Sequence, residues 1–343
     1  MHPSTYHSGT YMVKKYSKIA CIDIGTVTSR LALACFNSSN RMLQSIKKQS
    51  CICDLGEGLA ESGVLSDAAI GRVLAATSKF IDTARAWGAD TAVCTLTSAA
   101  RDAANSTILL GGLQAQGLAP QVIPGSVEAR LTFIGVASDF TEKRIVVCDS
   151  GGGSTELAVG TVYAHGVLEL EEVVSLQIGA RRITDMFLLE SNPPTLLARQ
   201  KAYDYCNQAY MRHMPAVLRN AALPIIAVGG TATSLVAMDK QLQPYDSAAV
   251  HLSHITTHKV GQLVDLLGSM TVDQRAHVVG LQPKRAKVIL GGTIVLQALL
   301  RVANSPYMQV SEHDLLYGLA NVAHAAQFGM QSFEDWDIQL SHL

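Results

Sequence analysis

The sequence predicts a mixed α/β protein with two similar halves. Short apolar, strand-like runs alternate along the chain with segments whose apolar residues have helical spacing, which is the pattern of an α/β fold. Apolar residues make up 48% of the 343 residues and charged residues only 16%, so strands and helices should be buried on both faces. In addition, a strand, a turn with Asp and Gly, and a second strand occur twice, with Asp23 and Asp149 at equivalent positions.

The first half is expected to begin with a hairpin. Its strands are residues 18–25 and 30–36, two apolar runs joined by a short polar turn. A helix follows, with Ser66 as its N-cap and Gly88 as its stop. The remaining elements are a strand over 91–97, a helix over 98–105, a strand over 120–125 and a helix with Ser126 as its N-cap.

The second half begins with the second hairpin, and helices then dominate it. The expected elements are strands over 144–151 and 155–163, one long helix over 195–218, a buried strand over 224–230, and helices over 231–238, 258–270, 284–302 and 313–327. The polar residues 1–16 lack the apolar core of a signal peptide and are predicted to form a flexible tail.

Charge and cysteine usage exclude several classes of protein. With 27 basic and 28 acidic residues, the chain has no overall field that recruits nucleic acid or an anionic membrane. Its seven cysteines are scattered and odd in number, which disfavours a disulfide framework and indicates a reducing cytoplasm. A zinc site at Cys51 and Cys53 is disfavoured because no second pair accompanies them. No apolar run reaches the roughly 20 residues of a membrane span.

The turn of the second hairpin is the strongest candidate for an anion site. It contains three glycines and two hydroxyl residues, namely Gly151, Gly152, Gly153, Ser154 and Thr155. Strand-forming runs flank the glycines, which disfavours a flexible linker, and consecutive glycine amides can point at one phosphate. Asp149 and Glu156, at its two ends, are hard oxygen ligands suited to Mg²⁺. The alternative is a tight turn without a ligand.

Two further turns have related but weaker features. In the first hairpin, Asp23 ends a strand, and Thr26 and Thr28 present hydroxyl groups. Gly230 and Thr231 lie where a strand leads into a helix, and a helix N-terminus favours anions. The alternatives are a plain turn and close packing of strand against helix.

Seven motifs, in this order, resemble one protein family: "DIGTVTSRL", "LGEGLAESGVLS", "TSAARDAAN", "VIPGSVEARL", "DSGGGSTEL", "GGTATSL" and "GLQPKRAKVILGG". They are similar to those of the exopolyphosphatase and guanosine pentaphosphate phosphatase family, in the superfamily of actin, sugar kinases and Hsp70. The resemblance implies two similar actin-like (ribonuclease H-like) domains with polyphosphate and metal in the cleft between them. It implies domain I over 17–125, domain II over 126–312, and a C-terminal helix over 313–327 that packs back on domain I.

The resemblance also assigns roles to single residues. Glu128 matches the family's proposed general base, which activates the attacking water; taken alone, a Glu in the first turn of a helix is explained by the helix dipole. Arg101 matches an arginine that contacts terminal phosphates. The glycine triplet with Ser154 matches the main phosphate loop, and the expected acids around Mg²⁺ are Asp149, Glu156 and Asp23.

Four residues depart from the family pattern. Val127 replaces a second acid before Glu128, and Val27 replaces the usual Asn. Lys287 stands where Asp is common, and Asp54 stands where Arg is frequent. The base and the acids expected around Mg²⁺ are retained, so activity is expected, and the departures bear on rate and chain-length preference.

Three histidines, His251, His254 and His258, lie close together in the sequence. The last two share a helical face, but no HExxH motif or acidic partner accompanies them, so a metal site is disfavoured.

The predicted function is therefore Mg²⁺-dependent release of terminal phosphate from inorganic polyphosphate. One alternative is a guanosine pentaphosphate 5′-phosphohydrolase that uses the same site, and another is a sensor that binds polyphosphate or nucleotide without hydrolysing it. A kinase is disfavoured because no motif matches a second-substrate site. The resemblance further implies a homodimer.

Overall fold

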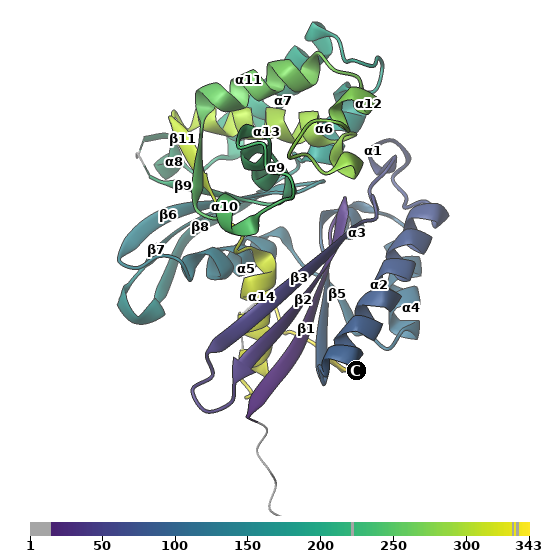
Figure 1. Cartoon of the computed structure of the whole chain (residues 1–343), viewed down its shortest axis with the longest axis vertical. Coiled ribbons are helices and arrows are strands. Elements are labelled where there is room, and N and C mark those ends of the chain that lie inside the picture. Colours follow the sequence, from purple (N-terminus) through teal and green to yellow (C-terminus); the bar gives the residue numbers. More distant parts are fainter. Residues whose placement is uncertain (1–14, 221–222, 331–332, 334–335) are drawn as a thin grey trace, which may run out of the picture.

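Two six-stranded β-sheets form the framework of the protein (Figure 1). The structure, a computed structural model, describes residues 15–220, 223–330, 333 and 336–343. The tail predicted for residues 1–16 lies outside the described residues except for Lys15 and Tyr16, and Tyr16 already belongs to the first strand.

In the first sheet, three consecutive strands form an antiparallel meander, and two later strands extend it in parallel. These strands are β1 (Tyr16–Ile24), β2 (Thr28–Asn37), β3 (Leu43–Ile52), β4 (Thr91–Leu96) and β5 (Pro120–Val122). Strand β4 lies beside β1, and β5 lies beside β4. The short β12 (Leu340–His342) also pairs with β4, in the antiparallel direction.

The second sheet repeats this arrangement. Its strands are β6 (Lys143–Ser150), β7 (Thr155–Val162), β8 (Leu168–Leu176), β9 (Ile225–Val228), β10 (Ser253–Thr256) and β11 (Tyr307–Val310). The first three form the meander, β9 adds in parallel beside β6, and β11 adds in parallel beside β9. This repeat confirms the predicted α/β fold of two similar halves, each of which begins with a hairpin.

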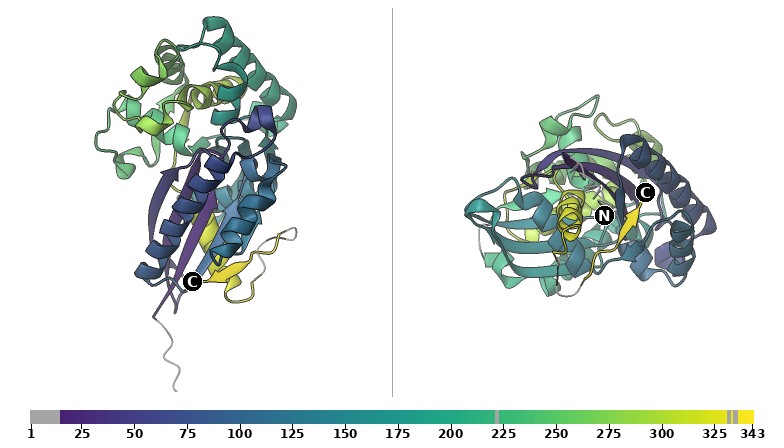
Figure 2. Two further views of the ribbon diagram at one scale, coloured as in Figure 1. Left: turned by 90° about the vertical axis from the view of Figure 1, so that its right-hand side faces the viewer. Right: turned by 90° about the horizontal axis from the view of Figure 1, so that it is seen from below.

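Two helices, α5 (Gly125–Ala137) and α14 (Leu315–Ala326), lie between the sheets (Figure 2). Because side chains alternate along a strand, each sheet presents one face to these helices and one to an outer helical layer. In β1, Ile19 packs with α14, whereas Ala20 joins the outer core. In β6, Ile145 packs with α5.

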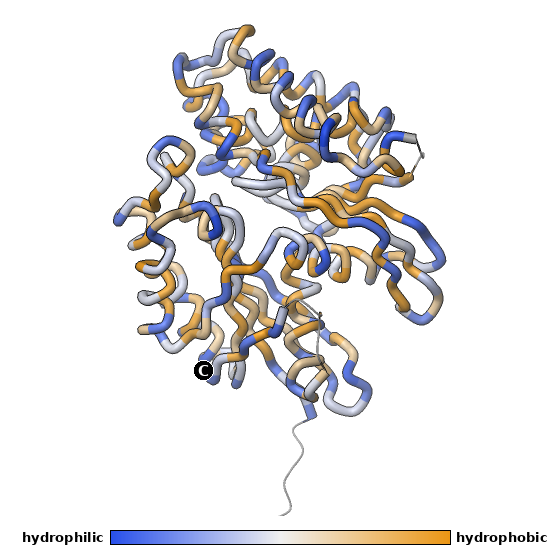
Figure 3. The backbone as a smooth tube through the Cα atoms, turned by 180° about the vertical axis from the view of Figure 1, so that it is seen from behind, coloured by the Kyte–Doolittle hydropathy of each residue, from blue (hydrophilic) through white to orange (hydrophobic). Residues whose placement is uncertain are grey.

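The outer helices cover the remaining face of each sheet. They are α2 (Asp67–Trp87) and α4 (Ser106–Ala115) on the first sheet, and α6 (Ala180–Phe187), α7 (Leu196–His213), α9 (Gly230–Asp239), α11 (Thr257–Gly268) and α13 (Ile289–Val302) on the second. The central strands are mostly hydrophobic, and the outer helices are mixed (Figure 3). Among the described residues, no helix combines the length and apolar character needed to cross a membrane.

The shorter helices lie in the connections between these elements. They are α1 (Leu59–Ser62), α3 (Ser98–Asp102), α8 (Ala216–Asn220), α10 (Ser247–Val250) and α12 (Val272–Arg275), with 3₁₀ turns at Ala164–Gly166 and Pro283–Arg285.

Helix α2 has the predicted ends, but other predicted boundaries are wrong; the helix predicted over 284–302, for example, begins only at Ile289. The Ser66 side chain accepts a hydrogen bond from the Ala69 amide, and Gly88 ends the helix in the left-handed conformation. The single helix predicted over 195–218 is broken into α7 and α8, because Pro215 lacks an amide proton and disfavours a helical residue before it. Helix α5 already begins at Gly125, so Ser126 is not its N-cap.

Strand β3 had no signal in the sequence. Among the described strands it pairs with β2 alone and lies at the edge of its sheet, and most of its side chains are polar and exposed, so it lacks the apolar run that predicts a strand. Strand β8 was also missed, although leucines and exposed glutamates alternate in its first half. The domain boundaries implied by the resemblance remain predictions.

The crossing of α5 and α14 is close enough to require glycine. A Cβ atom on Gly318 would lie 1.8 Å from the Leu131 carbonyl oxygen, and one on Gly135 would lie 2.1 Å from the Asp314 carbonyl oxygen. The two helix backbones are therefore in direct contact, and this contact sets the separation of the two sheets.

We expect Gly318→Ala to lower the free energy of unfolding by about 3 kcal/mol or more, because the obstructing atom belongs to a backbone that cannot turn aside. The matched control is Gly71→Ala on the exposed face of α2, where an added Cβ meets no atom within 4 Å. That change should stabilise by about 1 kcal/mol. Urea unfolding of both variants measures the difference, and equal stabilities would contradict the close crossing.

Candidate active site

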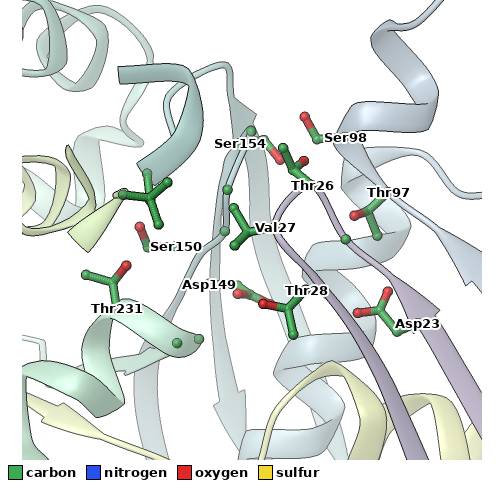
Figure 4. A pocket seen from close by; sticks show the side chains of 18 of the residues that line it. Asp23, Thr26, Val27, Thr28, Thr97, Ser98, Asp149, Ser150, Ser154 and Thr231 are labelled. Carbon is green, nitrogen blue, oxygen red and sulfur yellow. The ribbon is translucent and has the colours of Figure 1, made fainter. Parts of the chain in front are cut away.

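The two hairpin turns face each other at the junction of the two halves (Figure 4). A Cβ atom on Gly152 would lie 2.6 Å from Val27 Cγ2, and one on Gly153 would lie 2.8 Å from Thr26 Oγ1. No side chain fits on these glycines without displacing the opposite turn. The turns that repeat in the sequence thus meet in space.

A pocket of about 90 Å³ lies where the turns meet. Among its lining residues are ten of the predicted site residues: Asp23, Thr26, Glu128, Asp149, Gly151, Gly152, Gly153, Ser154, Gly230 and Thr231. Figure 4 shows Thr26, Ser98 and Ser154 together at one end and the side chains of Asp149 and Thr28 pointing toward one another. One pocket thus gathers residues from all three glycine turns.

The first residues of α6 hold the glycine loop in place through hydrogen bonds. The amide of Ala180 donates to the Gly151 carbonyl at 3.0 Å, and that of Arg181 donates to the Gly152 carbonyl at 2.8 Å. The Gly151 amide donates to the Ser154 carbonyl at 3.0 Å. Within the described part of the chain, the amides of Gly152 and Gly153 have no acceptor, so they remain available to an anion.

Three predicted site residues do not line the pocket. The Thr155 hydroxyl donates to the Ile178 carbonyl at 2.7 Å, a geometry that does not favour phosphate binding. Glu156 is buried behind the loop and accepts from the Ser175 hydroxyl at 2.7 Å. Arg101 does not line the pocket either, and its guanidinium contacts Glu128, Glu156 and Ser154.

The contacts of Arg101 join the loop to Glu128. Its Nη1 donates to Glu128 Oε2 at 2.8 Å, and its Nη2 lies 3.3 Å from Ser154 Oγ and 3.8 Å from Glu156 Oε1. Arg101 therefore fixes the position of Glu128, which lies in the first turn of α5 and is 7% exposed.

Acidic groups dominate the buried part of the site. Burial raises the pKa of Glu128 well above its usual range, Glu156 adds to this rise, and Arg101 opposes it. Burial also raises the pKa of Asp149 to about 6, and burial together with Asp149 raises that of Glu156 to about 7. Each of these carboxylates is thus held with too little positive charge around it.

A divalent cation would offset this excess of buried negative charge. Glu156 Oε2 is buried without a hydrogen-bond partner among the described residues, and Asp149 receives one hydrogen bond, from Thr132 at 2.9 Å. Carboxylate oxygens of this kind are ligands for Mg²⁺. Asp23 differs, because Arg30 donates to its Oδ2 from both Nε (3.0 Å) and Nη2 (2.7 Å). Its assignment as a metal ligand stays a prediction.

Two arginines of the pocket were missed. Arg30 bridges Asp23 and Asp314, and it stands inside the quoted motif "DIGTVTSRL". Arg285 stands in "GLQPKRAKVILGG", and its guanidinium lies on Gly230, where a Cβ would be 1.9 Å from Nη1. No described acid forms an ion pair with Arg285, and burial, aided by Arg30, lowers its pKa to about 10. A half-buried cation that pairs with no described acid suits a phosphate.

Three ion pairs between described residues join the two halves of the protein at one edge of their junction. Asp54 pairs with Arg181 on α6, Asp102 pairs with Arg182, and Glu57 Oε1 lies 3.5 Å from Lys287 Nζ. Each pair joins a segment of the first half to one of the second. Two residues that depart from the family pattern, Asp54 and Lys287, therefore both have a partner of opposite charge.

The three histidines have different environments. His254 and His258 lie outside any cluster of metal-binding side chains found among the described residues, whereas His251 lies near Asp139 and His313. The Glu312 amide donates to His251 Nδ1 at 3.1 Å, so neutral His251 carries its proton on Nε2, which faces Asp139 at 3.6 Å. A protonated Nε2 donates a hydrogen bond and cannot bind a metal. This group is therefore a hydrogen-bonded cluster.

Comparison with known proteins decides the family. The model of the Ppx/GppA phosphatase family matches residues 35–320. The chain belongs to the Ppx/GppA phosphatase family. This confirms the predicted family and the assignment as a phosphatase.

Individual members of the Ppx/GppA family agree with this. Exopolyphosphatase 2 of Mycobacterium tuberculosis (strain ATCC 25618 / H37Rv) is 32% identical over 318 residues, which are 89% of this chain and 98% of that protein. A bifunctional 3-dehydroquinate synthase/phosphatase of Fusobacterium nucleatum is 30% identical over 87% of this chain and 45% of its own length. The Aquifex aeolicus family member has a TM-score of 0.73 at 25% identity, covering 92% of this chain and all of its own. An exopolyphosphatase-like protein has a TM-score of 0.82 at 26% identity, with the same coverage.

The raised pKa of Glu156 predicts how stability depends on pH in the cation-free protein. Below about pH 4.5 this carboxyl is protonated in both the folded and the unfolded chain. Above about pH 7 it is ionised in both, and the free-energy cost of burying the ionised carboxylate then falls on the folded chain alone. The free energy of unfolding should therefore fall between these limits, by up to about 3 kcal/mol from this group.

Urea unfolding in EDTA from pH 5 to pH 8 measures this effect in wild type and in Glu156→Gln, where the fall should be smaller by that amount. Exposed Glu172→Gln is the matched control and should follow wild type. Parallel pH curves for wild type and Glu156→Gln would contradict the assignment. Added Mg²⁺ at pH 8 should restore stability to wild type and less to the variant.

Proposed function

We propose that the chain is an exopolyphosphatase that uses Mg²⁺ to release the terminal phosphate of inorganic polyphosphate. The observation that carries the proposal is the composition of one pocket, which contains Glu128, the Gly152 and Gly153 amides and Arg285. Among the described residues, these amides have no acceptor and Arg285 has no acidic partner. The exopolyphosphatases among its relatives support the choice of substrate.

The glycine loop and the hydroxyl groups around it bind the end of the chain in this proposal. The amides of Gly152 and Gly153 donate to oxygens of the terminal phosphate, and Ser154 and Thr26 add hydroxyl donors from the two turns. Arg285 offsets negative charge on the following phosphate groups. These donors favour the transition state, in which charge accumulates on the oxygens of the transferred group.

Glu128 acts as the general base. A water oxygen forms a bond to the terminal phosphorus, its proton passes to a Glu128 carboxylate oxygen, and the bridging P–O bond breaks to release the shortened chain. A pKa above the usual range of Glu makes this carboxylate a stronger base, and Arg101 holds it in position.

Asp149 would hold the cation, and Glu156 would offset part of its charge from behind the glycine loop. When bound, Mg²⁺ supplies positive charge to phosphate oxygens and offsets the excess of acidic groups. Asp149 lines the pocket, whereas Glu156 stands behind the loop and supports the site from the second layer. A homodimer and a cytoplasmic location, both expected from the sequence, remain predictions.

Glu128→Gln should lower kcat on polyphosphate by about 10² to 10⁴ with a KM within a few-fold of wild type, because the amide cannot accept the proton. Phosphate release from tripolyphosphate and from long polyphosphate measures this. Exposed Glu172→Gln loses the same charge elsewhere and should keep full activity. Near wild-type kcat in Glu128→Gln would remove Glu128 as the base; cation-independent binding with no turnover in wild type would favour a sensor.

A guanosine pentaphosphate 5′-phosphohydrolase is the second candidate, favoured by a larger pocket beside the first. It has a volume of about 950 Å³ and shares Arg30, Gly229, Gly230 and Arg285 with the smaller one. Tyr245 and Tyr317 line it together with several apolar side chains. Such a mixed lining suits a base and ribose better than a row of phosphates, which would call for unpaired cations along its length.

If the larger pocket holds a base, Tyr245→Ala should raise the KM for guanosine pentaphosphate about tenfold and leave that for tripolyphosphate unchanged. Tyr163→Ala is the matched control: Tyr163 is 44% exposed against 49% for Tyr245, and each hydroxyl donates to a glutamate. Equal effects of Tyr245→Ala on both substrates would count against a nucleotide-binding role.

A further inference from the structure

Two neighbouring arginines in the outer helical layer of the second sheet pair with no acid among the described residues. Arg275 ends α12 and is 2% exposed, and half-buried Arg199 lies in the first turn of α7. Arg275 Nε donates to the Leu267 carbonyl at 2.7 Å. Its Nη2 and the Nε of Arg199 are buried without a hydrogen-bond partner among the described residues.

Both guanidinium groups lie at the carboxyl end of α11. Leu267 and Gly268 are the last two residues of that helix, and a Cβ on Gly268 would be 2.3 Å from Arg199 Nη1. Arg199 therefore lies against the helix backbone at Gly268, the residue next to Leu267, whose carbonyl Arg275 binds. None of these residues lines the pocket of the candidate active site.

The charge around this pair is uncompensated. Neither arginine forms an ion pair with a described acid, and burial, followed by the repulsion of Arg199, lowers the pKa of Arg275 to about 10. The carboxyl end of α11 supplies only about half a negative charge. The first turn of α7, where Arg199 stands, is itself a positive end. Burying a cation with so little negative charge is costly, so the pair calls for an anion.

We propose that Arg199 and Arg275 form a second binding site, for a phosphate-type oxyanion. Guanidinium groups present several N–H donors in a planar fork, which matches the oxygens of phosphate. Phosphate is favoured over other oxyanions because the chain belongs to a family of phosphatases, so this choice rests on the family and not on the proposed substrate. The anion is either free orthophosphate or the distant end of a polyphosphate chain.

Hydrogen exchange of the full-length chain, followed by mass spectrometry, tests the site without turnover. Orthophosphate and, separately, tripolyphosphate are titrated in EDTA. Peptides that cover 192–200 and 264–277 should exchange more slowly in wild type, in a saturable way. In Arg199→Gln the half-saturating concentration should rise about tenfold, since a hydrogen bond to a charged group is lost. Protection by orthophosphate identifies the free ion, and protection by tripolyphosphate alone identifies the chain.

The controls separate this site from the active site and from folding defects. Arg301→Gln removes an exposed arginine from α13 and should titrate like wild type. Arg275→Lys keeps the charge but not the fork, and it should weaken binding while remaining folded by circular dichroism. Peptides over 149–156 report the active site in the same samples. Absent protection at 192–200 and 264–277 in wild type, or equal protection in Arg199→Gln, would overturn the proposal whether or not polyphosphate is hydrolysed.

Discussion

The contact between α5 and α14 is the constraint on which the site depends. Because Gly135 and Gly318 let the two backbones touch, the helices pack as one unit with a sheet on either side. Helix α5 carries Glu128 at its beginning, and Asp314, the N-cap of α14, binds Arg30 on β2. The same helix pair thus sets the distance between the sheets and brings the proposed base and a pocket arginine to their junction.

The electrostatics of the site follow from this placement. Three acids of the second half are buried near one another, and burial raises the pKa of each. Arg101 donates hydrogen bonds to both Glu128 and Ser154, and its single positive charge cannot offset the negative charge of all three acids. The site is therefore incomplete without cations on the side of the acids and without anions on the side of Arg285. A phosphate chain with its divalent cation supplies both, which links the charge imbalance of the pocket to the proposed chemistry.

The sequence predicted those parts of the fold that have a local signal. The apolar runs on either side of Asp23 and Asp149 predicted both hairpins, and the repeat predicted two similar halves. Edge strand β3 was not predicted, because most of its side chains are polar and exposed. In the site, the glycine turns were predicted because consecutive glycines allow the backbone amides to point at one anion. Arg285 was not found, because an arginine has no local signature; only the distant Gly230, on which it lies, makes it a pocket residue.

The departures from the family pattern have different physical weight. Val27 packs against Gly152 with its side chain 7% exposed, so it contributes to the contact between the turns and offers no polar group to a ligand. Asp54 and Lys287 lie outside the pocket lining, and each pairs across the junction with an oppositely charged residue. Their charges hold the two halves together at one edge and leave the reacting groups unchanged. The departures therefore bear on the contacts between the two halves, while the acids and the glycine loop of the proposed chemistry are all retained.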